Sequence, residues 1–275
     1  MTPILMSPMR VVTLAVFLAL PAAAQWINLP TPGIPRTPDN KPNLSAPAPK
    51  TSAGKTDFSG MWIPRDALPC NAEERGVLCT ELPLTPQTIN FATGLKGGLP
   101  YQSWAADLVR SRAKETAFLD PHVSCMPPNF PRAWSFPESE KILQTPTEIV
   151  ILHEFNATYR QIFLDGRKLP EDMLPTWNGY SVAHWEGDAL VVESAGYRDD
   201  SWLDVAGNFF SSEARVTERI RRPTFGSLDV DVTVNDAKVF MQPWTVSLHM
   251  RPLVDTEMID FFCQDNNKDL KHLVR

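Results

Sequence analysis

The feature that most restricts the fold of this 275-residue chain is the alternation of apolar and polar residues in its second half. In residues 228–234 and again in residues 244–250, every second residue is apolar and the residues between are polar or charged. Such alternation is typical of antiparallel strands with one face against the core and the other in solvent. Parallel neighbours need a crossover connection, usually a helix, and we expect no helix between these segments. This half of the chain is therefore predicted to form an antiparallel sheet.

Several further segments have the β-branched and aromatic composition of strands. They are residues 148–155, 158–164, 180–185, 189–195, 215–222 and 258–263. Short turns separate some of them, such as Asn156-Ala157 and the Gly187 turn that follows Trp185. With a first strand at 58–62, about nine strands follow one another along the chain. We predict a mainly β fold, an antiparallel up-and-down β-barrel of about eight to nine strands, because closure removes exposed strand edges.

The N-terminal residues 1–24 have the pattern of a secretory signal peptide. Arg10 precedes a ten-residue apolar run, Pro21 interrupts it, and the alanines at 22–24 offer a cleavage site. Ten residues are too few to span a bilayer, which takes about 20. A buried N-terminal strand is the alternative interpretation. We predict a periplasmic or secreted protein with no membrane span after cleavage of the signal.

The rest of the chain divides by composition. Residues 25–56 hold seven prolines among small polar residues and are predicted to be a Pro-rich disordered linker. Residues 57–275 are predicted to be a single barrel domain. Within it, 63–140 is an irregular insertion with one or two helices, expected at 101–118 and 86–93, and 141–265 is the antiparallel meander.

Composition and missing motifs exclude several function classes. The 26 basic and 32 acidic residues give a net charge of −6, which argues against a nucleic-acid partner because such proteins need a basic face. No Walker, G-x-G-x-x-G or G-x-S-x-G motif occurs, which disfavours nucleotide, dinucleotide and serine hydrolase chemistry. We therefore expect no cofactor.

The four cysteines, Cys70, Cys79, Cys125 and Cys263, suit disulfides in an exported protein. Cys70 and Cys79 flank a short polar segment, and Cys125 with Cys263 would then join a Pro-rich loop to the C-terminal strand. Four cysteines allow three pairings, and the sequence does not choose among them. No C-x-x-C spacing or Cys/His cluster indicates a metal site, so none is predicted.

Three ionisable residues stand on apolar strand faces: Arg160, Glu218 and His153. Burying any of them alone would cost several kcal/mol, so they should find polar partners. We expect an Arg160–Glu218 ion pair inside the barrel with His153 or Tyr159 nearby. Two interpretations remain open: a structural pair that fixes strand register, or the catalytic or ligand-binding floor of a pocket.

Loop residues provide further candidates. Asp199, Asp200 and Asp204 surround Trp202 and suit a cation site or an acid–base role at the barrel mouth, or a plain solvated loop. Trp134, Trp177 and Trp202 are candidate lids over a cavity. The residues predicted to contact a ligand are Tyr159, Trp177, Tyr180, Trp185, Trp202 and Asp204. Aromatic lids also suit sugars, so the sequence leaves the ligand class open.

Two resemblances add to this interpretation. Gly60-Met61-Trp62 resembles the G-x-W motif of lipocalins, which implies a calycin-like barrel of a type that often holds small apolar molecules. From Phe58 to Asp265 the chain also resembles an uncharacterised family of secreted bacterial β-barrel proteins, frequent in acidobacteria and sphingomonads. The matching segments are 59–62, 125–128, 159–163, 165–167, 177–181, 185–188, 217–219 and 243–245. Members of that family usually carry a His-rich patch where this chain has Asn208-Phe209-Phe210-Ser211.

Three functions follow as hypotheses. The first is a lipocalin-like barrel that binds a small apolar or aromatic molecule. The second is a cofactor-independent periplasmic enzyme, a lyase, isomerase or hydrolase, that uses Arg160, Glu218 and His153. The third is an envelope interaction protein. In the first two hypotheses the partner is a small-molecule ligand or substrate.

Overall fold

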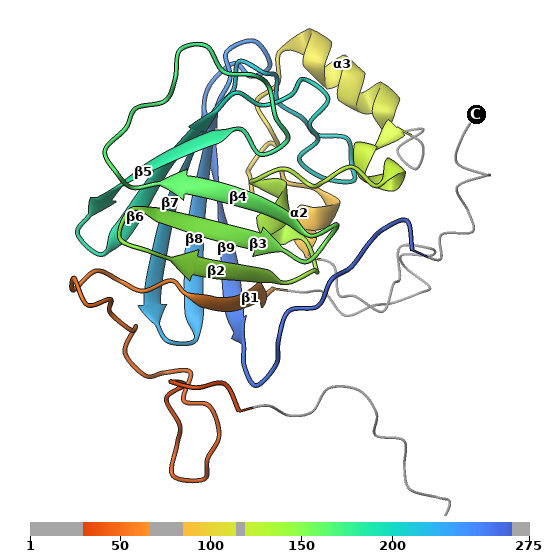
Figure 1. Ribbon diagram of the computed structural model, residues 1–275. Coiled ribbons are helices and arrows are strands. Elements are labelled where there is room, and N and C mark those ends of the chain that lie inside the picture. Colours follow the sequence, from red (N-terminus) through yellow and green to blue (C-terminus); the bar gives the residue numbers. More distant parts are fainter. Residues whose placement is uncertain (1–29, 67–84, 114–118, 266–275) are drawn as a thin grey trace, which may run out of the picture.

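A computed structural model describes residues 30–66, 85–113 and 119–265 of the chain. Nine strands pair in chain order, and the last returns to the first, so the sheet closes into a barrel (Figure 1). The strands are β1 (Gly60–Pro64), β2 (Glu140–Gln144), β3 (Glu148–His153), β4 (Thr158–Phe163), β5 (Tyr180–Glu186), β6 (Ala189–Ala195), β7 (Arg215–Thr224), β8 (Ser227–Asn235) and β9 (Trp244–Leu253). The predicted mainly β barrel is confirmed. The signal-peptide prediction at 1–24 lies outside the described residues.

One expected strand is absent, and one observed strand was not expected. Residues 258–263 form no strand, and Phe261 makes only an isolated bridge to Phe155. The ninth strand is β2, which the sequence did not indicate because Lys141, Ile142 and Leu143 do not alternate cleanly. β2 pairs with β1 and β3 and completes the wall of the barrel.

The expectation of purely antiparallel neighbours is wrong at one place, the pairing of β4 with β5. These strands run parallel, and their register covers only Ile162 with Ser181 and Phe163 with Val182. Residues 164–179 carry the chain back along the outside of the barrel without a helix, in place of a hairpin. This short parallel pairing, called the seam below, is the least extensive pairing in the wall.

Helical segments cover part of the barrel and fill part of its interior. The expected helices are shorter than predicted: α2 spans Pro86–Ile89 and α3 spans Ser103–Arg112, and residues 114–118 lie outside the described parts. α3 lies outside the barrel (Figure 1). Two 3₁₀ helices, η3 (Pro121–Ser124) and η4 (Arg132–Ser135), follow, and the fully buried Trp134 of η4 reaches an inward-facing strand residue. None of these helices is long and apolar enough to cross a membrane.

The Gly60-x-Trp62 segment begins β1 in the wall of the barrel. Gly60 has φ +136°, which L-residues rarely adopt, and Trp62 is fully buried and donates from Nε1 to the Phe58 carbonyl at 2.9 Å. The guanidinium of Arg222 lies 4.7 Å from the Trp62 ring. The same group donates to the carbonyls of Asp57 and Ser59, so it ties β7 to the segment before β1.

Residues 30–56, the described part of the predicted Pro-rich linker, contact the barrel at several points. The turn after β7 donates from Phe225 N to the carbonyl of Ala46 and from Gly226 N to that of Leu44. A Cβ on Gly226 would lie 2.5 Å from the Leu44 Cβ, so only glycine allows this approach. Lys50 forms an ion pair with Asp188 at 2.5 Å. Backbone hydrogen bonds therefore hold a segment that has almost no apolar side chains to bury.

One disulfide joins Cys125, at the end of η3, to Cys263 near the C-terminal end of the described chain. Asn156 lies beside it and bridges both segments: its Nδ2 donates to the Cys125 carbonyl and its Oδ1 accepts from Cys263 N. The other two cysteines, Cys70 and Cys79, lie outside the described residues.

Candidate functional site

A buried polar network lies inside the barrel and includes the expected Arg160–Glu218 ion pair. Arg160 on β4 donates from Nη1 and Nη2 to the carboxylate of Glu218 on β7, and both side chains are almost completely buried. The same guanidinium donates from Nε to Ser181 of β5 at 3.1 Å and from Nη2 to Ser194 of β6 at 2.9 Å. Four consecutive strands thus contribute to one network.

Trp134 completes this network from η4. Its Nε1 donates to Oε1 of Glu218 at 2.6 Å, so the predicted lid is instead an interior side chain. Burial alone would lower the pKa of Arg160, but the adjacent Glu218 carboxylate outweighs it and the net pKa shift is upward. The guanidinium therefore stays charged.

The position of the network relative to the seam indicates what it does. Backbone pairing between β4 and β5 covers two residue pairs, and the Arg160–Ser181 bond adds a side-chain connection between the same two strands. Because the polar groups of Arg160 and Glu218 bond to one another and to Ser181, Ser194 and Trp134, the geometry favours the interpretation that this pair fixes the barrel wall.

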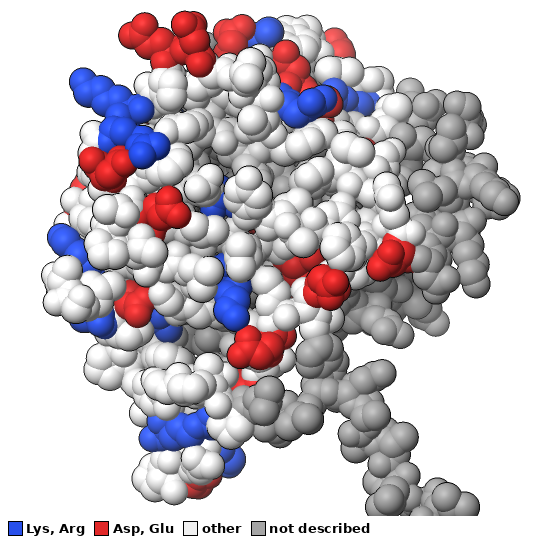
Figure 2. All heavy atoms as spheres, viewed as in Figure 1, with Lys and Arg blue, Asp and Glu red and all other residues white. Residues whose placement is uncertain are grey.

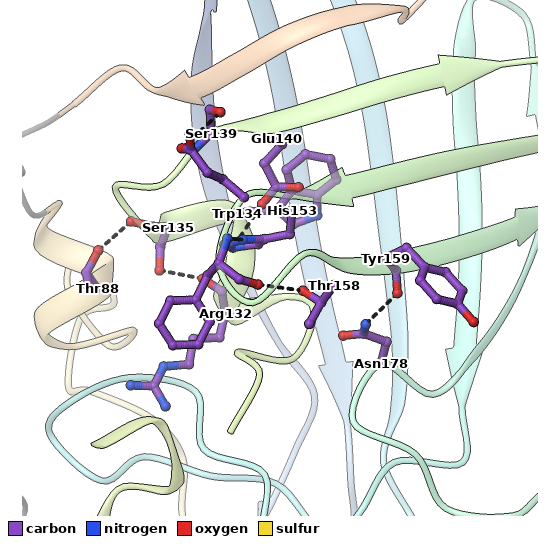
Figure 3. A network of polar contacts seen from close by, with 12 residues as sticks. Thr88, Arg132, Trp134, Ser135, Ser139, Glu140, His153, Thr158, Tyr159 and Asn178 are labelled. Carbon is purple, nitrogen blue, oxygen red and sulfur yellow. Dashed lines mark hydrogen bonds and ion pairs between the residues drawn. The ribbon is translucent and has the colours of Figure 1, made fainter. Parts of the chain in front are cut away.

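His153 contacts a residue that the sequence did not single out, Glu140. The two residues face each other across β2 and β3, both are buried, and His153 Nε2 lies 3.7 Å from Glu140 Oε1 (Figure 3). His153 Nδ1 accepts a hydrogen bond from Phe155 N, so the neutral ring carries its proton on Nε2. Burial raises the pKa of Glu140 well above its ordinary value and lowers that of His153 to about 3. At neutral pH the His153 ring is therefore uncharged.

These and other buried groups give the free energy of unfolding a characteristic pH dependence. Burial raises the pKa of Glu138 to about 7 and that of Asp204 to about 6, and it lowers the pKa of His122, like that of His153, to about 3. The stabilisation from the carboxyls is complete at acidic pH and is lost as the pH rises through 6 to 7. The stabilisation from the histidines is complete above 6.5 and is lost as the pH falls toward 3.

We therefore expect the stability to change little between pH 7 and 4.5, where the two effects oppose each other. Below that range the histidine effect remains, and stability falls by up to about 1.4 kcal/mol per pH unit for each histidine. Urea unfolding at pH 3.5 to 7 measures this. His153→Gln should reduce the fall, whereas His184→Gln, at an exposed position, should not. A curve for the first variant that matches the parent curve contradicts the assignment.

A pocket of about 470 Å³ lies at the seam, where β4 and β5 diverge, and we call it the seam pocket. The side chains that define it are Tyr159, Gln161, Phe163, Trp177, Asn178 and Tyr180. Three of them, Tyr159, Trp177 and Tyr180, were predicted to contact a ligand. Asn178 holds its wall together by donating from Nδ2 to the Tyr159 carbonyl at 2.9 Å (Figure 3). Arg160 and Ser181 of the buried network also line the pocket.

The remaining predicted ligand residues lie elsewhere. Trp185 stacks on Phe58 with ring centroids 5.7 Å apart. Trp202 packs against the guanidinium of Arg112, and the buried Asp204 accepts backbone hydrogen bonds from residues 91, 206 and 208, which makes it a structural carboxylate.

Asp199 and Asp200, the other two carboxylates of this loop, have separate partners. Asp199 accepts from Ser212 N, and Asp200 pairs with Arg198. Across the described ranges, no three His, Cys, Asp or Glu side chains are grouped to hold a metal ion.

The fold and the site define a closed, nine-stranded β-barrel with a buried ion pair and an aromatic pocket at its one parallel seam. Comparison of the chain with models of protein families, with curated proteins and with solved structures found no match.

Proposed function

We propose that this protein is an exported β-barrel that binds a small molecule with an apolar or aromatic face in the seam pocket. The observation that carries the proposal is the convergence of Tyr159, Trp177 and Tyr180, from β4, from the connection and from β5, on a single pocket. Its volume of about 470 Å³ is within the range of small-molecule sites. The Tyr159 side chain is 61% exposed, so an aromatic surface is open to a ligand.

A ligand site inside the barrel is less well supported than one at the wall, because buried side chains fill the interior. Trp62 and Trp134 are both fully buried and belong to one continuous core cluster with the inward-facing strand residues. A ligand at the seam needs no displacement of these rings. The proposal therefore differs from a lipocalin-like barrel in the place of the ligand, which lies against the wall.

Catalysis by Arg160, Glu218 and His153 has weaker support. A general base needs a free lone pair that faces the substrate, but Glu218 accepts from Arg160 and Trp134, and His153 Nδ1 accepts from Phe155 N. His153 also bonds to neither member of the ion pair. No observation on the described residues favours the envelope-interaction hypothesis over binding.

Tyr159→Ala tests the proposed binding function. With the neutral dye Nile red as probe, we expect its fluorescence titration to show a dissociation constant weaker by about tenfold, or about 1.4 kcal/mol, because the open aromatic surface is lost. Leu143→Ala is the matched control, since Leu143 is a 44% exposed strand residue outside the seam pocket. Equal affinities for the parent protein and both variants would show that the dye does not bind at the seam.

A further inference from the structure

The charges around the seam pocket indicate what kind of ligand it takes. Among the described residues that line it, Arg160 is the one with a full charge, and its guanidinium is already bonded to Glu218 and two serines. A ligand carboxylate or phosphate therefore finds no free cation in the lining, and a ligand ammonium finds no carboxylate. The lining suits an uncharged ligand.

Two arginines at the margin of the seam pocket do not change this balance. Arg167 stacks on Phe163 at 3.8 Å and pairs with Asp165, and Arg198 stacks on Trp177 at 4.7 Å. Arg198 in turn pairs with Asp200 at 2.7 Å. On the face shown in Figure 2, acidic and basic side chains are scattered, with uncharged surface between them. Each nearby cation thus has its own carboxylate.

Some polar side chains of the pocket are left mainly as hydrogen-bond acceptors. Thr158 Oγ1 donates to the Phe155 carbonyl, Thr176 Oγ1 donates to the Gly179 carbonyl, and Asn178 Nδ2 donates to the Tyr159 carbonyl. The hydroxyl protons of both threonines are engaged, as is one of the two N–H groups of Asn178, and the threonine oxygens can still accept. Oδ1 of Asn178 is buried and has no hydrogen-bond partner among the described residues.

Donors remain on two other side chains. The Tyr180 hydroxyl accepts from Arg167 Nη1 and keeps its own proton to donate, and the Gln161 amide is exposed. A ligand that matches this lining carries groups that both donate and accept, as hydroxyl groups do. A purely apolar ligand would cover the Tyr180 and Gln161 donors without pairing them, which is unfavourable.

We propose that the ligand of the seam pocket is a short neutral saccharide, an inference that rests on the proposed binding function. Its hydroxyl groups meet the acceptor oxygens of Thr158 and Thr176 and the donors of Tyr180 and Gln161. The C–H face of a sugar ring lies on Tyr159. The electron-rich face of an aromatic ring attracts such polarised C–H groups.

The test uses the full mature protein and a panel of neutral trisaccharides: maltotriose, cellotriose, laminaritriose and tri-N-acetylchitotriose. Isothermal titration and saturation-transfer NMR should detect binding of at least one of them. We expect Tyr159→Ala to weaken that binding at least tenfold and Gln161→Ala about fivefold, with Leu143→Ala unchanged. Circular dichroism and thermal unfolding of each variant verify that it is folded.

Nile red and trigalacturonic acid separate the possible failures. If Nile red binds and is lost in Tyr159→Ala, but no neutral trisaccharide binds, the saccharide inference is overturned and the binding function stands. Trigalacturonic acid binding as tightly as the best neutral trisaccharide overturns the argument from charge. If neither Nile red nor any saccharide binds, both the inference and the proposed function are rejected.

Discussion

Glu218→Gln is expected to lower the free energy of unfolding by about 3–5 kcal/mol, the largest effect of a single substitution that we predict. The amide keeps the shape of the carboxylate and still accepts from Trp134, but it leaves the Arg160 guanidinium buried without a counter-charge. Equilibrium unfolding in urea measures the change. Glu193→Gln is the matched control, because Glu193 is an exposed glutamate on the neighbouring strand β6 and should shift the value by less than about 0.5 kcal/mol.

Replacing both charged residues tests whether the loss of stability in Glu218→Gln comes from the unpaired charge of Arg160. In an Arg160→Met/Glu218→Met double variant no charge stays buried, and the two serines still bond to each other at 2.8 Å. We expect the free energy of unfolding of the double variant to exceed that of Glu218→Gln by about 2 kcal/mol or more. The reason is that apolar replacement of a buried ion pair is often close to neutral. A loss below about 1 kcal/mol in Glu218→Gln contradicts the view that this pair holds the seam.

Of the strands that the sequence predicted correctly, two show clean alternation of apolar and polar residues. Residues 228–234 and 244–250 lie within β8 and β9, because a period of two fixes which face of a strand is buried. Residues 258–263 have a similar apolar content, but the adjacent disulfide and backbone bonds to residues 154 and 156 fix them beside the barrel without a partner strand.

The parallel seam was not predictable from local pattern. Parallel neighbours normally require a helical crossover, and residues 164–179 contain none. Only the closure of the whole sheet brings Ile162 beside Ser181. A rule about pairs of strands cannot predict this pairing, because closure of the sheet depends on all nine strands.

The candidate site shows the same division between local and tertiary signals. Arg160 and Glu218 were found because each stands on an otherwise apolar strand face, and that signal is local. Glu140 and the interior role of Trp134 were missed because both lie in or beside the proline-rich residues 127–137. No periodicity there identifies the inward side. Trp202 and Asp204 were assigned to a ligand from their loop position, yet contacts with Arg112 and Asn208 give them a structural role.

The second large effect is expected on removal of the Cys125–Cys263 disulfide. The bridge closes a loop with a sequence separation of 138 residues. For a loop of this length the chain-entropy model gives about 5 kcal/mol, and loss of a native bridge typically costs about 2–5 kcal/mol. We therefore expect a Cys125→Ser/Cys263→Ser variant to lose about 2–5 kcal/mol of unfolding free energy in urea.

This loss should arise mainly in the unfolded chain, because the contacts beside the bridge do not use its sulfur atoms. Asn156 bonds to the backbone of both cysteines and should hold the two segments together in the folded variant. The variant should thus keep the circular dichroism spectrum of the parent while its urea m-value rises, since an unbridged unfolded chain exposes more surface. A loss below about 1 kcal/mol with an unchanged m-value would show that the bridge restrains the unfolded chain little, and that Asn156 and its backbone contacts suffice to fix the C-terminal segment.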